Sequence, residues 1–305
     1  MRLGVLDVGS NTVHLQVVDA SPGARPNPNI NHKEDLRLAE YLSADGFISA
    51  EGARLLREAI KRALVAAKSA EIDELLPFAT SALREAVNGA EIISRINEDF
   101  EIDLQVLSGE DEARITFLAA RRWYGWSSGR LLMVDIGGGS LEIAVGVNEV
   151  PDVALSLPLG ASRLTKDHLR GDPFTKKSIR NLRDHIERDI AEILPTIVQH
   201  QDSDRSIATS KTLRTLARIC GDWIDGNGKK LRIDSLRKIT PRLAEMSQED
   251  RAELPGVSNT RAKQITAGAF VAEAVMRNLD IEELEICPWA LREGIVLKWL
   301  DWMES

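Results

Sequence analysis

The stretch "VDIGGGSLEIAVG" at residues 134–146 places three consecutive glycines between an aspartate and a Ser-x-Glu, with strand-like apolar residues on both sides. A run of glycines lets the backbone approach a ligand closely and turn its N–H groups toward an anion such as phosphate. An ordinary β-hairpin, in which glycine only supplies positive φ angles, is the alternative. Short glycine motifs arise often by chance, so this stretch alone leaves both interpretations open.

The first residues of the chain repeat this pattern. The stretch "VLDVGSNTVHLQVVD" at residues 5–19 aligns without a gap with "MVDIGGGSLEIAVGV" at residues 133–147. Each copy reads as a strand, a glycine turn and a strand, and the copies lie too far apart for a solenoid. Duplication of a whole domain explains them better and predicts two similar halves with two similar loops. The aligned pairs are Asp7 with Asp135, Gly9 with Gly137, Thr12 with Ser140, His14 with Glu142 and Leu15 with Ile143.

Helical and strand-like segments alternate around the two loops, which predicts an α/β fold. Ser49 is the expected N-cap of the first helix. Two segments read as irregular: 21–31, a turn-rich hairpin tip, and 221–232, a loose polar loop. The expected helices are 48–70, 88–100, 109–125, 176–199 and 211–221, and the expected strands include 75–83, 102–108 and 205–210.

Composition narrows the class of protein. A length of 305 residues suffices for two domains, and no segment approaches the about 18 uninterrupted apolar residues of a membrane span. The net charge of −8 argues against a general nucleic-acid binder. The N-terminus lacks a signal-peptide pattern, so the cytoplasm is the expected location. Cys220 and Cys287 belong to no metal-binding cluster and read as two buried reduced thiols.

Seven segments together resemble the exopolyphosphatase / guanosine pentaphosphate phosphohydrolase family. They are "DVGSNTVHL", "ATSALREAVN", "LSGEDEARITF", "VDIGGGSLEI", "LPLGASRL", "LPGVSNTRAKQITAG" and "ALREGI", which follow the family order along the chain. The resemblance implies two similar actin-like (ribonuclease H-like) domains with mixed sheets flanked by helices, and an active site in the interdomain cleft. The expected domains are 1–120 and 121–305, with the helix 293–305 packing back on the first. The chain resembles the two-domain members of the family.

The resemblance implies that Glu112 is the general base that activates water, with Asp111 as the acid before it. The alternative is structural, because Ser108 and Asp111 form a near capping box and acids favour a first helical turn. Asp135 and Glu142 match the acids of the second loop and are expected to hold Mg²⁺ or Mn²⁺. The alternative makes Asp135 a turn former and Glu142 an outward-facing strand residue. A lone histidine on a strand is usually structural, so His14 is not taken as a ligand.

The remaining matched positions are expected to bind phosphate. Arg84 matches a family arginine, whose fork can hold a phosphate by two bonds, although it could equally solvate a helix start. Where the family commonly has glycine in a turn close to adenosine in nucleotide-binding relatives, this chain has Lys211, followed by Arg214 at the usual basic position. Lys211 fills the space of a base and weakens an ATPase or kinase interpretation. The full expected set is Asp7, Gly9, Ser10, Asn11, Arg84, Gly137, Gly138, Gly139, Ser140, Lys211 and Arg214.

The sequence therefore predicts a hydrolase that removes terminal orthophosphate from inorganic polyphosphate, with guanosine pentaphosphate as the alternative substrate. A sugar or acetate kinase and an actin-like ATPase are more remote alternatives. Short polyphosphate chains are expected to be favoured, because the basic clusters 121–123 and 228–232 read as solvated surface rather than as a binding track. A homodimer is expected, without nucleic-acid or membrane partners.

Overall fold

The computed structural model describes residues 1–21, 23–43, 45–199 and 203–304. It divides into two compact units, one of Met1–Ala119 with Leu291–Ser305 and one of Ala120–Ala290. Within the described residues, every helix is too short or too polar to traverse a lipid bilayer.

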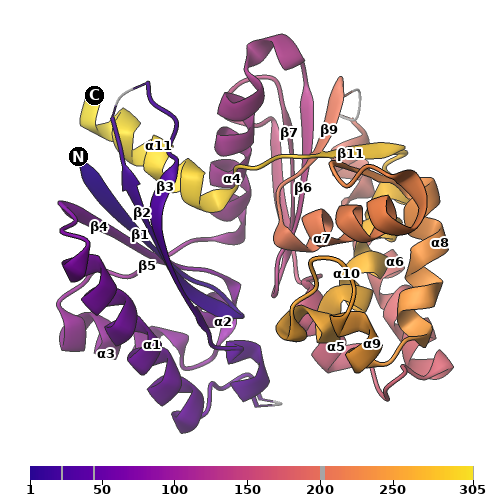
Figure 1. Ribbon diagram of the computed structural model, residues 1–305, viewed down its shortest axis with the longest axis horizontal. Coiled ribbons are helices and arrows are strands. Elements are labelled where there is room, and N and C mark those ends of the chain that lie inside the picture. The colour runs from indigo at the N-terminus through magenta and orange to yellow at the C-terminus, as the bar shows by residue number, and fades with distance from the viewer. Residues whose placement is uncertain (22, 44, 200–202, 305) are drawn as a thin grey trace. The chain divides into compact units, whose positions relative to one another are not determined.

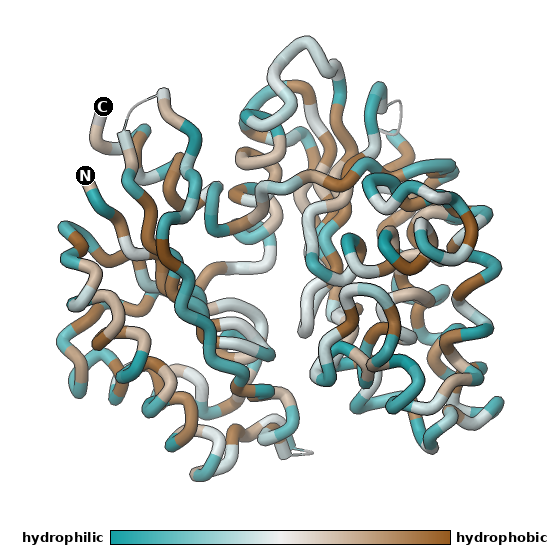
Figure 2. Tube along the Cα trace, viewed as in Figure 1, coloured by the Kyte–Doolittle hydropathy of each residue, from teal (hydrophilic) through white to brown (hydrophobic). Residues whose placement is uncertain are grey.

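The first unit is built on a five-stranded sheet in the order β3-β2-β1-β4-β5 (Figure 1). The pairs β1–β2 and β2–β3 are antiparallel, whereas β1–β4 and β4–β5 are parallel. Strand β3 lies at one edge and is hydrophilic along most of its length, as Figure 2 shows, which suits an exposed edge. The strands are β1 (Arg2–Val8), β2 (Thr12–Asp19), β3 (Pro28–Asp35), β4 (Glu74–Ala79) and β5 (Gln105–Val106).

Helices cover both faces of this sheet because its central strands carry apolar residues on both faces. Leu6 and Val8 pack in a core with α1 and α3, whereas Leu3 and Val5 pack with Val296 and Leu300 of α11. The predicted cap of α1 is confirmed, since the Ser49 side chain accepts a hydrogen bond from the Gly52 N–H at 3.1 Å. The helices of this unit are η1 (Leu38–Tyr41), α1 (Ala50–Ser69), α2 (Ser81–Glu85), α3 (Gly89–Phe100), the first part of α4 (Gly109–Tyr124) and α11 (Leu291–Glu304).

The second unit has a six-stranded sheet in the order β10-β11-β9-β6-β7-β8. The pairs β6–β7 and β7–β8 are antiparallel, whereas β6–β9 and β9–β11 are parallel. Read from β8, the first five strands repeat the order and directions of the first sheet, and antiparallel β10 is added at the edge. The strands are β6 (Leu131–Ile136), β7 (Leu141–Gly146), β8 (Val153–Leu157), β9 (Arg205–Ala208), β10 (Lys230–Arg232) and β11 (Glu283–Ile286).

The helices of the second unit surround α10, whose small and apolar residues from Ala262 to Met276 are almost all buried. A helix that is apolar on most sides is typical of a core position. The helices are η2 (Trp126–Ser128), α5 (Ala161–His168), α6 (Lys176–Val198), α7 (Lys211–Cys220), the π-helix η3 (Gly221–Asp225), α8 (Ile233–Glu245), α9 (Gln248–Ala252) and α10 (Asn259–Asn278).

The predicted duplication is confirmed at the level of single residues. Asp7 lies opposite His14 in the first hairpin, and Asp135 lies opposite Glu142 in the second. The same turn hydrogen bond closes both hairpins, from the Gly9 N–H to the Thr12 carbonyl at 3.0 Å and from the Gly137 N–H to the Ser140 carbonyl at 2.9 Å. The α/β class with two similar halves is therefore correct.

Three local predictions need correction. The segment 221–232 is not a loose loop, because it contains η3 and β10, which pairs with β11. The strand expected over 102–108 is only Gln105–Val106, since β5 is an edge strand with a single neighbour. In the segment 21–31, β3 begins at Pro28, so its last residues are strand rather than turn, and residue 22 lies outside the described residues.

Candidate active site

The glycine loop of the second hairpin is held from one side by helix α5. The N–H of Ala161 donates to the Gly137 carbonyl at 3.0 Å, and the N–H of Ser162 donates to the Gly138 carbonyl at 2.9 Å. Arg163 Nε donates to the Gly139 carbonyl at 2.9 Å. The three glycine carbonyls are thus all engaged within the protein, and of the loop N–H groups that of Gly137 closes the turn by donating to the Ser140 carbonyl.

Gly9 and Gly137 occupy the same place in the two hairpins, and neither has a φ in the left-handed region. A Cβ at Gly9 would come no closer than 3.6 Å to another atom, and one at Gly137 no closer than 3.4 Å, so the chain itself leaves room for a side chain. The hairpin alternative, in which glycine only supplies positive φ, is therefore wrong at these two positions. Open space above a backbone is what close approach of a ligand requires.

The two predicted metal ligands face each other across the second hairpin. Asp135 and Glu142 are directly paired in the register of β6 and β7, which puts their side chains on one face as near neighbours. Glu142 is only 2% exposed, so the alternative interpretation, in which it is an outward-facing strand residue, is wrong. Ser156 Oγ donates to Glu142 Oε1 at 2.9 Å, and Thr209 Oγ1 donates to Asp135 Oδ2.

The electrostatics of this pair suit a divalent cation. Burial raises the pKa of Asp135 to about 6, while the Thr209 hydroxyl and the charge of Arg214 act in the opposite direction. Among the described residues, no cluster of three or more His, Cys, Asp or Glu side chains could hold a metal. Two hard carboxylates with the remaining positions open to water and substrate oxygens fit Mg²⁺, which keeps much of its hydration.

The predicted cations of this unit lie at the start of α7. Ser210 caps the helix by accepting from the Leu213 N–H at 3.2 Å, and it also accepts from the Ile136 N–H at 3.3 Å, next to Asp135. Arg214 Nη2 donates to the Cys287 carbonyl at 3.1 Å, and the charge of Arg214 acts on Asp135. Lys211 is exposed at the first position of the helix.

In the first hairpin, the predicted phosphate-binding residues contact other residues of the first unit. Ser10 is buried, with its hydroxyl 2.9 Å from the Ser81 hydroxyl. The Asn11 carbonyl accepts from the N–H groups of residues 36 and 37 at 2.9 Å each. Asp7 Oδ2 lies 3.6 Å from Arg292 Nη1.

The predicted base, Glu112, lies in the first turn of α4 and takes no part in its cap. Ser108 caps the helix together with Asp111: the Asp111 N–H donates to Ser108 Oγ at 3.0 Å, and the Ser108 hydroxyl donates back to Asp111 Oδ2 at 2.7 Å. Glu112 Oε2 instead accepts from Arg84 Nη1 at 3.2 Å, and the same Arg84 nitrogen donates to the Leu107 carbonyl at 2.9 Å. The structure thus pairs Arg84 and Glu112, two residues that the sequence had assigned to separate roles.

Sequence reasoning missed the partners of the predicted residues. Ser81 and Arg292 stood within recognised motifs but received no role. Thr209 and Ser156 reach Asp135 and Glu142 only because β9 pairs with β6 and β8 with β7, and a single sequence does not reveal strand pairing.

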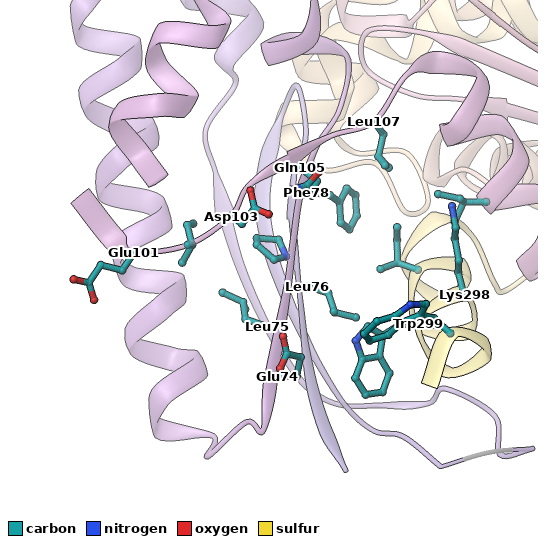
Figure 3. A pocket seen from close by; sticks show the side chains of 15 residues that line it. Glu74, Leu75, Leu76, Phe78, Glu101, Asp103, Gln105, Leu107, Lys298 and Trp299 are labelled. Carbon is teal, nitrogen blue, oxygen red and sulfur yellow. The ribbon is translucent and has the colours of Figure 1, made fainter. Parts of the chain in front are cut away.

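A cavity of about 660 Å³ in the first unit contains none of the predicted site residues. Figure 3 shows that its walls are largely apolar, with Phe78, Leu76 and Trp299 among the labelled side chains. Its charged residues are three carboxylates, Glu74, Glu101 and Asp103, and a single cation, Lys298, whereas binding of phosphate needs several converging cations.

Comparison with known proteins agrees with the resemblance seen in the sequence. A model of the Ppx/GppA phosphatase family matches residues 17–303. Exopolyphosphatase 1 of Mycobacterium tuberculosis (strain ATCC 25618 / H37Rv) is 50% identical over 305 residues, which cover 99% of this chain and 89% of that protein. Exopolyphosphatase 1 of Mycobacterium leprae (strain TN) is 48% identical, with 99% and 90% covered.

Solved structures agree in fold. An exopolyphosphatase from Cytophaga hutchinsonii ATCC 33406 has a TM-score of 0.87 at 23% identity, covering 99% of this chain and 98% of that one. The Aquifex aeolicus member of the Ppx/GppA family has a TM-score of 0.81 at 23% identity, covering 100% and 99%. The predicted family and fold class are confirmed, and the chain belongs to the Ppx/GppA phosphatase family.

Proposed function

We propose that this protein is an exopolyphosphatase, which hydrolyses the terminal phosphoanhydride bond of inorganic polyphosphate and releases orthophosphate. The observation that carries the proposal is the acid pair, half-buried Asp135 opposite buried Glu142, beside a glycine loop whose carbonyls are all engaged. Relatives about half identical over nearly the whole chain bear the name Exopolyphosphatase 1.

In this proposal, the two glycine hairpins bind phosphate oxygens through their N–H groups and hydroxyls. Asp135 and Glu142 hold Mg²⁺ or Mn²⁺, which neutralises phosphate charge when bound. Glu112 takes a proton from the attacking water as its oxygen bonds to the terminal phosphorus. The bond from that phosphorus to the bridging oxygen breaks, which leaves orthophosphate and a chain one unit shorter.

Arg84 supports Glu112 in the resting enzyme. A guanidinium 3.2 Å from a carboxylate favours its ionised form, which is the form a general base needs. Because Arg84 has further donors, it can also serve a phosphate oxygen, as the family resemblance implies. Both side chains are mostly shielded from solvent, at 19% and 15% exposed, so their interaction is only weakly screened.

Guanosine pentaphosphate is the second candidate substrate, because its 5′-terminal phosphoanhydride would use the same groups. Lys211 stands at the start of α7, where the resemblance implies a glycine close to the adenosine in nucleotide-binding relatives, and this argues against both ATP-dependent alternatives.

The test compares orthophosphate release from polyphosphate of defined length, from guanosine pentaphosphate, and from ATP with and without sugars, using the Asp135→Asn variant as a control for contaminating phosphatases. Release from polyphosphate without nucleotide, lost in the variant, is expected. Faster turnover of guanosine pentaphosphate would reverse the order of the two candidates, and activity only with ATP would refute the proposal.

A further inference from the structure

The two hairpins share one geometry but carry different charges. At the pair of positions where the second hairpin has Asp135 and Glu142, the first has Asp7 and His14. A second carboxylate is therefore replaced by an imidazole. Two adjacent carboxylates favour a bound divalent cation, whereas one carboxylate beside a neutral imidazole leaves a single negative charge to be balanced.

The chain itself supplies that charge to the first hairpin. Arg292, in the first turn of α11, lies with Nη1 3.6 Å from Asp7 Oδ2 and in hydrogen-bond contact with His14 Nδ1. A guanidinium can only donate, so His14 Nδ1 accepts and the ring proton resides on Nε2. His14 Nε2 lies 3.2 Å from Asn31 Oδ1, which accepts a hydrogen bond from it. The first hairpin thus holds a neutral His14 and a paired Asp7.

The helical turn that carries Arg292 is fixed on both sides. Glu293 Oε1 accepts from Gln16 Nε2 at 3.2 Å, and both residues are buried in the first unit. A Cβ on Gly294 would lie 2.2 Å from the Ile115 carbonyl oxygen, so the turn of α11 rests directly on the backbone of α4. Ile115 lies one helical turn after Glu112. Arg292 is therefore anchored to the strand of the first hairpin and to the helix of the proposed base.

The fold does not use all the donors of Arg292. Its Nε is buried and has no hydrogen-bond partner among the described residues. An unsatisfied buried donor is costly, and a purely structural position would be served better by an apolar side chain. Resting on the proposed function, we infer that Arg292 is a positioning residue: it takes in the first hairpin the place that the metal ion takes in the second, and it orients Asp7 for substrate phosphate.

The first test uses Arg292→Met, which removes the charge and keeps the length, with Lys298→Met on the exposed side of α11 as the matched control. Arg292→Met should lower kcat/KM on polyphosphate by about 10- to 100-fold, mainly through KM, as expected when a partner that orients a binding group is lost. Its melting temperature should stay close to that of the control. Arg292→Lys should recover part of the loss.

Activity of Arg292→Met within about threefold of the control would overturn the inference, since loss of a partly buried ion-pair partner that orients a substrate-binding group should cost more than that. If Arg292→Met and Arg292→Lys both fail to fold, Arg292 is a folding contact and the inference is equally wrong.

The second test counts bound Mn²⁺ by electron paramagnetic resonance with inorganic phosphate present, and it does not depend on turnover. One ion per chain is expected in the wild type and in Arg292→Met, and none in Asp135→Asn. Two ions in the wild type, with one lost in Asp7→Asn, would refute the inference. If the wild type binds one Mn²⁺ ion per chain but does not hydrolyse polyphosphate, the proposed function is wrong. The inference that Arg292 takes the place of a metal ion in the first hairpin then still stands.

Discussion

Single residues decide what each hairpin can do. The two hairpins share the same strand pairing and the same turn hydrogen bond. The second hairpin pairs Asp135 with Glu142, whereas the first pairs Asp7 with His14, and the Arg292 guanidinium contacts both of these. A second residue-level decision separates Asp111 from Glu112. Asp111 pairs with Ser108, the residue that caps α4, whereas the neighbouring carboxylate of Glu112 pairs with Arg84.

Glu112→Gln is expected to fold and to bind substrate, but to lose hydrolysis by about 10²- to 10⁴-fold in kcat, because an amide cannot accept the proton from water. Asp111→Asn is the matched control. It should keep wild-type kcat and lose about 0.3–1 kcal/mol of stability, as a charge is removed from a helix N-terminus. Steady-state kinetics and thermal unfolding of both variants check this. Equal kcat for the two variants would return Glu112 to a structural role.

Metal removal is expected to abolish activity, because Asp135 and Glu142 offer only hard oxygen ligands and leave phosphate charge unneutralised without an ion. The measurement is orthophosphate release after dialysis against excess chelator, followed by addition of Mg²⁺ or Mn²⁺. Activity should return with either ion. Full activity in chelator would contradict the assignment of these two acids.

Cys220 should be unreactive in the folded protein. Burial raises the pKa of its thiol to about 12 from an ordinary 9.0, so the reactive thiolate is scarce at pH 8, and the side chain is inaccessible. Cys287 is equally buried. A thiol reagent should find no thiol in the native state and two after denaturation. Since the pKa of Cys220 is higher in the folded than in the unfolded chain, folding favours the neutral thiol. The resulting contribution to the free energy of unfolding is present below pH 9 and is lost as the pH rises toward 12.

At the scale of elements, helix α5 works as the support of the glycine loop. Its first N–H groups and Arg163 engage the three glycine carbonyls, and Gly160 allows this contact because a Cβ there would lie 2.2 Å from the Gly139 carbonyl carbon. The loop is thus held by backbone geometry rather than by its own side chains.

This support leads to opposite expectations for two glycines. Gly137→Ala meets no close atom and should fold normally, but it should raise KM because a methyl group enters the space of the phosphate. Gly160→Ala should displace the loop and lower both stability and kcat. Thermal unfolding and the separate kinetic constants distinguish the two variants. A Gly137→Ala enzyme with unchanged KM would remove the support for a phosphate loop.

The periodicity of the sequence predicted α1, α3, α4, α6 and α7, because each buries one apolar face. The repeated hairpin was predicted because both copies keep the aspartate, the turn glycine and the strand pattern around them. Periodicity failed where contacts between segments distant in the sequence determine the local structure. The strand β10 lies in the segment expected to be a loop, since only its pairing with β11 makes it a strand. The bonds of Thr209 to Asp135 and of Arg292 to His14 span 74 and 278 residues, which local patterns cannot reveal.

At the scale of the whole molecule, cations of both basic clusters are engaged within the protein. In the basic cluster 121–123, Arg121 is fully buried and donates to the Gly129 and Gly146 carbonyls, whereas Arg122 pairs with Glu149 at 2.7 Å. The prediction that this cluster is solvated surface is therefore wrong for Arg121, although the cluster is no track of exposed cations either. In the cluster 228–232, Lys230 pairs with Glu283 at 2.5 Å.

The last prediction follows from this distribution of charge. A track that holds long polyphosphate needs a row of accessible cations, but the chain carries a net charge of −8, and both basic clusters contain cations engaged within the protein. Added substrate length should then bring little extra affinity, so we expect kcat/KM to be highest for short chains and product release to be frequent. The measurement is kcat/KM over polyphosphates of defined length, with the oligomeric state determined by light scattering, since a homodimer is expected. If kcat/KM rises steadily with length in the dimer but not in a monomeric variant, the track is built by two copies and the preference for short chains is refuted.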